Sequence, residues 1–277
     1  MGVSQPAVSQ AIRKLETSAG IQLFHRTGGR LVATEEAHAL MVDDKLFVGM
    51  DAIEHRIKSL KQSGTGRLAI AVHPVVGNTF TPRALAEFDL AERDIRVSLR
   101  VQSSREVHQE VSAGLCDFGV MADEMPVVRL EHSEFINEPG VIALPKGHPL
   151  IDKSSICAKD LSGYDFIALN PEDSSRRCLK VALDLENVSL NVRVETADAH
   201  TICSTVSQGI GIAFIKPLAA VDFIDRGVVV KAFDLDIRTR SLLLFRPGKP
   251  LAESAKKLLA FMRVQLARDL KLVKRYL

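Results

Sequence analysis

The spacing of apolar positions changes near residue 66, and it predicts different structures on either side. Before that point apolar residues recur every three or four positions, the period of amphipathic helices. After it, short apolar runs alternate with amphipathic segments in the order strand, helix, strand. This alternation is typical of an α/β fold, so we expect an α/β domain to occupy most of the chain.

Residues 1–33 predict one helix followed by a short hairpin. Ser4 supplies a hydroxyl N-cap, and Pro6 lies in the first turn, where its fixed φ is favourable. The apolar residues of this helix follow at helical spacing: Ala7, Val8, Ala11, Ile12 and Leu15. Short apolar segments then flank Gly28-Gly29, which predicts a tight turn between two strands.

Residues 34–63 predict one long helix with a single apolar seam. Thr34 can cap it, and the acidic pair Glu35-Glu36 lies in the first turn, where the helix dipole favours negative charge. The seam has a spacing close to a heptad and consists of Ala39, Val42, Leu46, Met50, Ile53, Ile57 and Leu60. Such a helix needs a partner, so we expect dimerisation, with packing against its own chain as the alternative.

Two series of strands and helices follow, and a similar five-residue sequence occurs in both. The first series has strands at 68–72, 95–101, 118–121 and 141–144, with a helix that begins at a Ser103/Glu106 capping box and ends at Gly114. The second has strands at 166–169, 190–194 and 212–215, with helices at 177–186 and from about residue 198. Val111–Leu115 (VSAGL) recurs as Val206–Ile210 (VSQGI). Two similar series favour two lobes with a cleft between them.

Composition excludes several classes of protein. The formal net charge is +2, 46% of the residues are hydrophobic, and no apolar run reaches the roughly 18 residues that a membrane-spanning helix needs. The N-terminus lacks the pattern of an export signal. Four widely separated cysteines disfavour a disulfide framework or a structural zinc site and fit a reducing cytoplasm.

The charge is unevenly distributed along the chain. Residues 1–33 carry four basic side chains and one acidic one, and residues 251–277 carry seven basic and two acidic ones. Either end could contact phosphate, although a solvated charged face is the alternative.

Sequence signatures of catalysis are weak. The eight histidines show no H-x-x-x-H spacing, and neither a G-x-S-x-G elbow nor a P-loop is present. His200 and Cys203 would share one helix, a spacing that is common by chance. We therefore expect no catalytic residues, no metal and no cofactor, and a protein that works by binding.

Several segments, in the right order, resemble LysR-type transcriptional regulators. Residues 4–16 (SQPAVSQAIRKLE) and 20–26 (GIQLFHR) are similar to the winged helix-turn-helix of that family. The resemblance continues through 114–117 (GLCD), 144–150 (LPKGHPL) and 209–211 (GIG), and so covers essentially the whole chain.

Within the family, three shorter segments are most similar to the branch that regulates catabolism of the opines octopine and nopaline. These segments are 47–51 (FVGMD), 64–68 (GTGRL) and 82–85 (PRAL).

The resemblance implies an α/β protein with three parts. These are a partial winged helix-turn-helix at 1–33, a long dimerisation helix at 34–63, and a two-lobed effector-binding domain of the periplasmic-binding-protein type at 67–277. We expect lobe I to contain 67–145 plus 247–270 and lobe II to contain 146–246, with crossings near 144–146 and 245–247. A final helix at 251–270 should return to lobe I through an apolar face made of Ala255, Leu258, Leu259, Met262 and Leu266.

The resemblance also implies that the chain binds double-stranded operator DNA. A recognition helix reads base edges with its N-terminal residues while basic side chains hold phosphates, and glutamine can read adenine. The expected DNA-binding residues on this helix are Ser4, Gln5, Pro6, Ser9, Gln10, Arg13 and Lys14, and those of the wing are Arg26, Thr27 and Arg30.

The family usually has a further helix and most of a second before this motif. We therefore expect a chain truncated at its N-terminus or a start codon placed too far downstream. Val8, Ile12 and Leu15 would then lack their apolar cover. The alternative function is a solute-binding and dimerisation module with no DNA-binding activity of its own.

A small carboxylated metabolite, an opine or a related amino acid, is the effector that the resemblance implies. The expected effector-binding residues are His73, Pro74, Val75, Asn170, Ser174, Ser175, Arg176, Ala197, Asp198 and His200. Arg176 could pair with a carboxylate and Asp198 with an amine. A surface charge and a helix N-cap are the respective alternatives, and both histidines could be structural. The family further implies a homodimer and a homotetramer in the cytoplasm, with no membrane partner.

Overall fold

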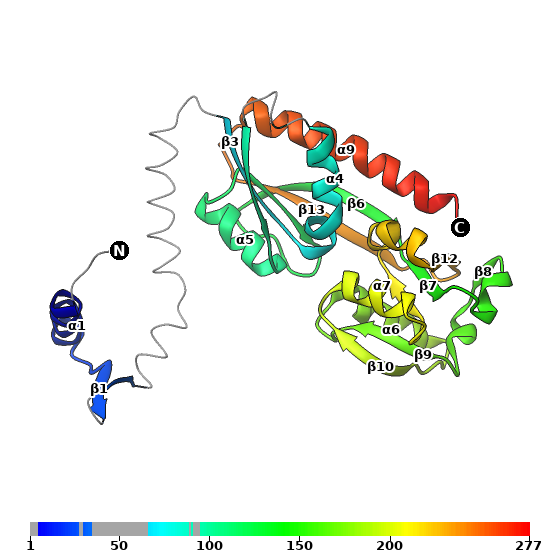
Figure 1. Cartoon of the computed structure of the whole chain (residues 1–277), viewed down its shortest axis with the longest axis horizontal. Helices are drawn as coiled ribbons and strands as arrows, with labels where there is room; N and C mark the ends of the chain where they lie inside the picture. The colour runs from blue at the N-terminus through cyan, green and yellow to red at the C-terminus, as the bar shows by residue number, and fades with distance from the viewer. Residues whose placement is uncertain (1–4, 28–29, 35–65, 89, 91–94) are drawn as a thin grey trace. The chain divides into compact units, whose positions relative to one another are not determined.

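A computed structural model describes residues 5–27, 30–34, 66–88, 90 and 95–277 (Figure 1). The chain divides into two compact units, 1–57 and 58–277, and each is described by itself. The long helix expected at 34–63 and the cap expected at Ser4 lie outside the described residues. No helix in the part of the chain that the structure describes is long and apolar enough to cross a membrane.

The first unit contains the predicted helix and hairpin. Helix α1 (Gln5–Ala19) precedes the antiparallel strands β1 (Phe24–Thr27) and β2 (Arg30–Ala33). The Glu16 carboxylate accepts hydrogen bonds from the backbone N–H groups of Leu23, at 2.8 Å, and Phe24, at 2.9 Å. This contact fixes the hairpin to the last turn of the helix.

Lobe I of the second unit is built on a five-stranded sheet in the order β4-β3-β5-β13-β6. Its strands are β3 (Gly66–Val72), β4 (Ile95–Val101), β5 (Phe118–Ala122), β6 (Glu131–Pro139) and β13 (Arg238–Phe245). The first three are parallel, and β13 pairs antiparallel with both β5 and β6. Helix α5 (Ser104–Ala113) covers one face, and α4 (Thr81–Glu87) and α9 (Glu253–Lys274) cover the other.

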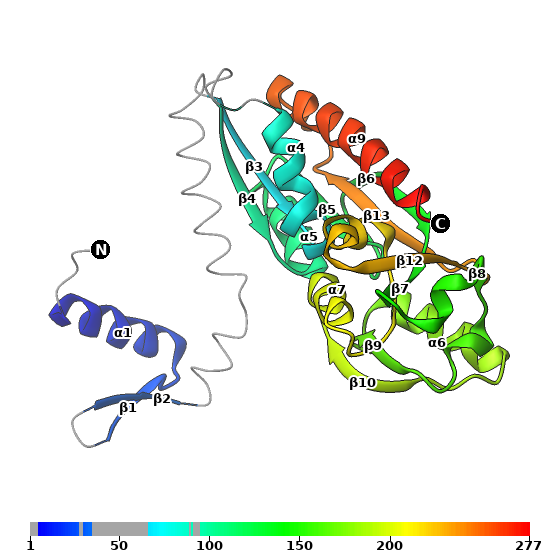
Figure 2. The ribbon, with the colours of Figure 1, turned by 45° about the vertical axis from the view of Figure 1, so that its right-hand side comes forward.

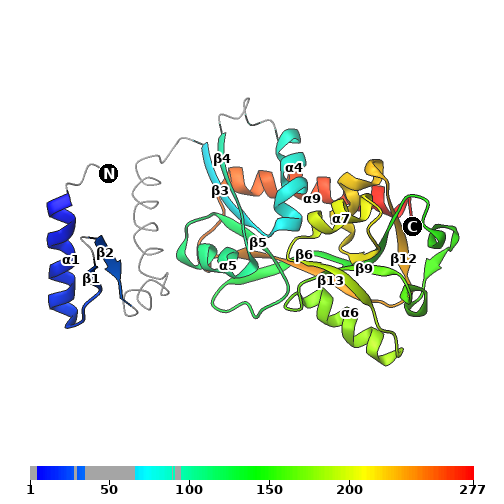
Figure 3. The ribbon, with the colours of Figure 1, turned by 60° about the horizontal axis from the view of Figure 1, so that its bottom comes forward.

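Lobe II contains a four-stranded sheet in the order β11-β7-β12-β8 and a parallel pair, β9 with β10. The strands are β7 (Val141–Pro145), β8 (Ser155–Ile156), β9 (Asp165–Leu169), β10 (Asn191–Thr196), β11 (Ala213–Ile215) and β12 (Val228–Phe233). Helices α6 (Ser174–Leu185) and α7 (Ala199–Ser207) lie on opposite sides of β9 (Figure 3). The short helix α8 (Pro217–Ala220) follows β11.

The chain crosses between the lobes at two places that differ from those expected. The first crossing is at Gly140, between β6 and β7, and the second is at 234–237, between β12 and β13. Lobe I is therefore 66–139 plus 238–274, and lobe II is 141–233, which corrects the boundaries at 145/146 and 246/247. The apolar runs of β7 and β13 look alike in sequence, so hydrophobic patterning could not show which sheet each one joins.

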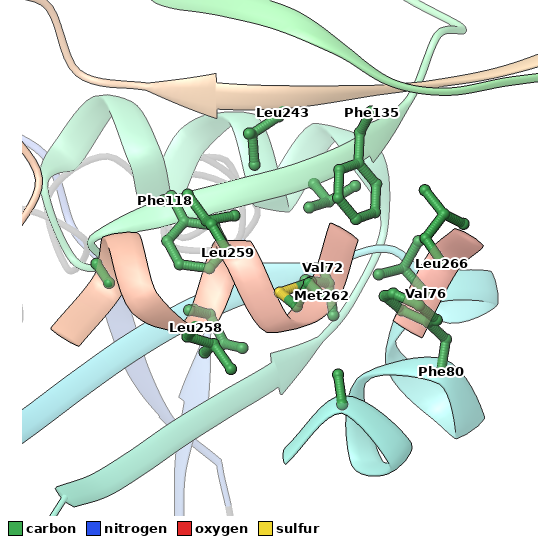
Figure 4. Packing of buried hydrophobic residues seen from close by; sticks show 14 of the residues in the cluster. Val72, Val76, Phe80, Phe118, Phe135, Leu243, Leu258, Leu259, Met262 and Leu266 are labelled. Atoms are coloured by element: carbon green, nitrogen blue, oxygen red, sulfur yellow. The ribbon is translucent and has the colours of Figure 1, made fainter. Parts of the chain in front are cut away.

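The final helix confirms the predicted return to lobe I. Helix α9 extends a few residues beyond the predicted 270 and runs beside α4 (Figure 2). All five predicted apolar residues are buried, and Leu258, Leu259, Met262 and Leu266 pack in a cluster with side chains of the sheet and of the segment after β3 (Figure 4). Near its end, Val273 joins a lobe II cluster, so α9 contacts both lobes.

Candidate ligand-binding site

A cavity of about 580 Å³ lies between the lobes. Its volume falls within the range of small-molecule sites. Lobe I contributes His73, Pro74, Val75, Gln102, Ser103, Ser104, Arg105, Ala122, Glu124 and Met125, and lobe II contributes Leu169, Asn170, Glu172, Asp173, Ala197, Ala199 and Lys216.

Most of these residues follow the carboxyl ends of strands. In lobe I, His73 follows β3 and Gln102 follows β4. In lobe II, Asn170 follows β9, Ala197 follows β10 and Lys216 follows β11. Ligands of α/β proteins bind at such an edge because strand ends place loops and helix N-termini there.

His73 lies in the wall of the cavity and is 3% exposed. Its Nε2 atom is 3.0 Å from the hydroxyl of Ser241 on β13. Burial, and next the positive charge of Lys216, lower the pKa of His73 well below its ordinary value. His73 is therefore a neutral imidazole at neutral pH and leaves the positive charge at this place to Lys216.

Lys216 and Gln102 carry donors without acceptors. Lys216 is 7% exposed as a residue and lines the cavity, its ammonium group is not fully buried, and no residue that the structure describes hydrogen-bonds to that group or pairs with it. The buried Nε2 atom of Gln102 likewise has no partner in the described part of the chain. Buried polar groups are normally satisfied within a fold, so the unpaired Gln102 donor is unusual, and it lines the same cavity as the unpaired ammonium group of Lys216.

The start of α5 forms one wall of the cavity and confirms the predicted capping box. Ser103 and Glu106 exchange the two reciprocal hydrogen bonds. The Ser103 hydroxyl also donates to the Glu106 carboxylate at 2.6 Å, and this bond, and next the one from the Ser103 backbone N–H, lower the pKa of the Glu106 carboxyl. The Ser104 hydroxyl accepts a hydrogen bond from the Ala122 N–H at 3.1 Å, and Arg105 also lines the cavity. The wall is therefore held to the end of β5 as well as to its own helix.

Half of the residues expected to bind the effector line this cavity. His73, Pro74, Val75, Asn170 and Ala197 do so, and the structure brings them together from both lobes.

The other five expected residues lie outside the cavity lining. The Ser175 hydroxyl is bonded to Asp173, the N-cap of α6, and Ser174 begins that helix. Arg176 faces Glu195, with 4.0 Å between Nη2 and Oε1. These side chains interact within lobe II instead.

Asp198 and His200 also have structural partners. Asp198 is the N-cap of α7 and accepts hydrogen bonds from the N–H, at 3.0 Å, and the hydroxyl, at 2.9 Å, of Thr201. It also accepts a long hydrogen bond, 3.4 Å, from Asn78 of lobe I. His200 packs edge-on against Phe223. The N-cap alternative for Asp198 is the one that the structure supports.

Sequence analysis missed Gln102, Arg105, Glu124 and Lys216. Lys216 does carry a signal, because it is the single charged residue in the otherwise apolar run 212–220 (IAFIKPLAA). A charge inside a core segment is costly unless it is paired, so its presence indicates a functional role.

Other candidate chemistry finds no site in the described residues. No group of His, Cys, Asp and Glu side chains there could hold a metal ion. Burial raises the pKa of the Cys116 and Cys203 thiols to about 12. Neither thiol is therefore a nucleophile at neutral pH.

Part of the expected DNA-binding surface is described. On α1, Gln10, Arg13 and Lys14 are exposed and Ser9 is half-buried. Ser4, and the side chains of Gln5, Pro6, Arg26, Thr27 and Arg30, lie outside the described residues.

Solved structures share this fold. A Corynebacterium glutamicum OxyR C206 mutant superposes with a TM-score of 0.61 at 20% identity and covers 99% of this chain and 88% of that one. The Synechocystis CcmR regulatory domain, in complex with 2-PG, has a TM-score of 0.60 at 24% identity over 72% of this chain and 97% of that chain.

Comparison of sequences defines the family. Residues 61–267 match the LysR substrate binding domain, and residues 1–38 match the bacterial regulatory helix-turn-helix protein, lysR family. The chain is 31% identical to the transcriptional activator protein LysR of Escherichia coli, over 91% of this chain and 82% of that protein. It is 33% identical to the regulatory protein NocR of Agrobacterium tumefaciens, over 84% and 78% respectively. These relatives are transcriptional regulators and not enzymes, and the chain belongs to the LysR family of transcriptional regulators.

Proposed function

We propose that this regulator binds operator DNA and that a small carboxylated metabolite in the interlobe cavity modulates the binding. The observation that carries the proposal is the cavity itself, because strand ends from both lobes line it. A ligand that contacts both lobes favours their closed arrangement over an open one. A hundredfold preference for the closed state would supply about 2.7 kcal/mol.

The polar lining supports an amino-acid-like or opine-like ligand. Lys216 and Arg105 are basic, and Glu124, Glu172 and Asp173 are acidic. A cavity with both signs of charge is suited to a molecule that carries both a carboxylate and an amine or guanidinium. A 31% identical relative, OccR of Rhizobium meliloti, is named for octopine catabolism and uptake, which also supports this class.

The DNA-reading element is α1 with the adjoining hairpin. Its exposed Gln10, Arg13 and Lys14 suit base edges and phosphates. We further propose a cytoplasmic homodimer formed through residues 34–63, and a homotetramer formed through the effector-binding domains. The apolar seam that the sequence predicts at 34–63 supports the dimer, because a single apolar stripe on a helix requires a partner.

Operator binding tests this function directly. DNA fragments selected from a random pool by the chain would provide the operator, and fluorescence anisotropy would measure affinity with and without octopine, nopaline, L-lysine or L-glutamate. We expect specific binding and a change in affinity with at least one of the four. Calorimetric binding of one of them without any DNA binding would favour the alternative, a solute-binding module.

A further inference from the structure

We infer that Lys216 and Gln102 bind a carboxylate of the effector inside the interlobe cavity and so determine its specificity for acids. The inference rests on the proposed function, because it assumes that the cavity binds a ligand. Beyond that function, it assigns two hydrogen-bond donors of the lining to one ligand group, which carries a single negative charge.

Lys216 is a largely buried residue whose ammonium group has no partner in the described part of the chain. Lys216 is 93% buried as a residue, yet no acceptor for its ammonium group exists in the described part of the chain. An ammonium group without an acceptor in the fold can pair with an anion supplied from outside, and a carboxylate would form charge-assisted hydrogen bonds with it. The side chain lines the cavity, so such an anion can reach it.

Among the described residues, Gln102 supplies a second hydrogen-bond donor without an acceptor at the same cavity. The Nε2 atom of Gln102 is buried and unpartnered among the described residues, and Gln102 lines the same cavity from the other lobe. The Gln102 N–H donates to the Val72 carbonyl at 3.1 Å, which places Gln102 beside His73 across two paired strands. The Lys216 charge also acts on His73, and all three residues line the same cavity.

The charges of the residues that line the cavity favour a ligand group with one negative charge. His73 is neutral, so Lys216 is the one buried cation of the lining, and Arg105 lies at an exposed position. One buried positive charge balances the single charge of a carboxylate but not the two charges of a phosphate. The acidic lining residues, among them Glu124 and Asp173, also disfavour a dianion.

The first test needs no ligand. In Lys216→Met the stem is retained and an unpaired charge is removed from a largely buried residue, so the ligand-free variant should unfold at a higher temperature than the unsubstituted chain. Lys146→Met, at an exposed lysine of the same lobe, is the matched control and should leave the midpoint unchanged. A lower midpoint for Lys216→Met would show that the ammonium group is structural and would overturn the inference.

The second test uses named probes. Thermal-shift and calorimetric titrations compare L-glutamate, L-lysine, octopine and succinate with succinamide and with inorganic phosphate. We expect at least one carboxylate to stabilise the unsubstituted chain, and succinamide and phosphate to do so less. Binding of that carboxylate should fall about 10- to 100-fold in Lys216→Met and in Gln102→Leu, but not in Gln109→Leu at an exposed position on α5.

Three outcomes of this test overturn the inference. They are no stabilisation by any carboxylate, equal carboxylate binding in Lys216→Met, and a preference for phosphate. Operator affinity measured in the same samples separates this inference from the proposed function. A ligand that still changes operator affinity in Lys216→Met leaves the effector function standing and removes only the role of Lys216.

Discussion

His73 shows how one buried side chain links stability to pH. Its pKa in the folded chain is lowered below the ordinary value of about 6.5, mainly by burial. Between the two pKa values the unfolded chain binds more protons than the folded one, so folding weakens as pH falls. His73 also shares a hydrogen bond with the Ser241 hydroxyl, which helps to hold the wall of the cavity. This bond requires a neutral imidazole when the His73 nitrogen is the acceptor, but not when it is the donor.

We predict that the free energy of unfolding decreases as pH falls below about 6.5, and that His73→Gln reduces the slope. One proton changes the free energy of unfolding by about 1.4 kcal/mol per pH unit at most. Urea titrations between pH 5 and 8 would measure both slopes. His132→Gln, at an exposed histidine of β6, is the control, and a slope for His73→Gln equal to that of the control would refute the prediction.

Two glycines close to each other in the chain should respond differently to alanine. A Cβ at Gly211 would lie 2.5 Å from the backbone oxygen of Asp165, whereas one at Gly209 would meet nothing within 4 Å. Gly209 has a φ of +77°, so alanine at this position would be destabilised only by the left-handed backbone conformation and not by a steric clash. We expect Gly209→Ala to cost about 1 kcal/mol and Gly211→Ala about 2–3 kcal/mol. Denaturant unfolding would rank them, and equal costs would contradict the difference in packing.

Residues whose role is local could be predicted from the sequence, and residues whose partners are distant could not. The Ser103 cap and the glycine at 114 follow from spacings within one element. Arg176 was expected to bind the effector because its segment resembles one that lines the cleft in the family, but in the structure it faces Glu195 of β10, a residue distant in sequence. The two donors at 102 and 216 converge only after two sheets have formed.

At the scale of elements, local periodicity predicted most strands and helices but not how they pair. Several elements were predicted close to their observed positions. They are strands β3, β4 and β5 of lobe I, strands β7, β9 and β11 of lobe II, and helices α5 and α9. Strands β12 and β13 were not predicted. Their pairing with β7, β5 and β6 joins segments far apart in sequence, and that information is absent from a local pattern.

Arg83 connects three elements through two carboxylates. Its Nη1 atom is 2.5 Å from Asp222, in the segment after α8, and its Nη2 atom is 2.7 Å from Asp269 of α9. Asp269 is buried and also accepts a hydrogen bond from Gln265 at 2.7 Å. Since α4 belongs to lobe I and Asp222 to lobe II, the contact spans the lobes.

We predict that Arg83→Met lowers the free energy of unfolding by about 3 kcal/mol, because it leaves Asp269 buried without its cation. Arg268→Met is the matched control, since its ion pair with Glu87 is solvent-exposed and should contribute less than about 1 kcal/mol. Equilibrium denaturation of the two variants would measure the costs. A loss for Arg83→Met as small as that of the control would show that the triad is not stabilising.

At the scale of the whole molecule, the proposed function assigns DNA binding and ligand binding to different parts of the chain. Arg13 lies exposed on α1, in the unit distinct from that of the cavity. We predict that Arg13→Ala weakens operator binding and, if the contact is to phosphate, reduces the slope of log affinity against log salt by about 1. Ligand binding measured by calorimetry should not change, and loss of both activities would indicate a folding defect.

If occupancy of the cavity controls operator binding, the response of operator affinity to the effector must depend on the lining of the cavity. Operator affinity is determined by anisotropy as a function of effector concentration for the unsubstituted chain and for Lys216→Met. We expect the variant to retain operator affinity without effector, and the effector concentration for half-maximal response to rise at least about tenfold. An unchanged response in Lys216→Met, together with unchanged calorimetric binding, would show that the effector binds elsewhere and that the cavity does not control operator binding.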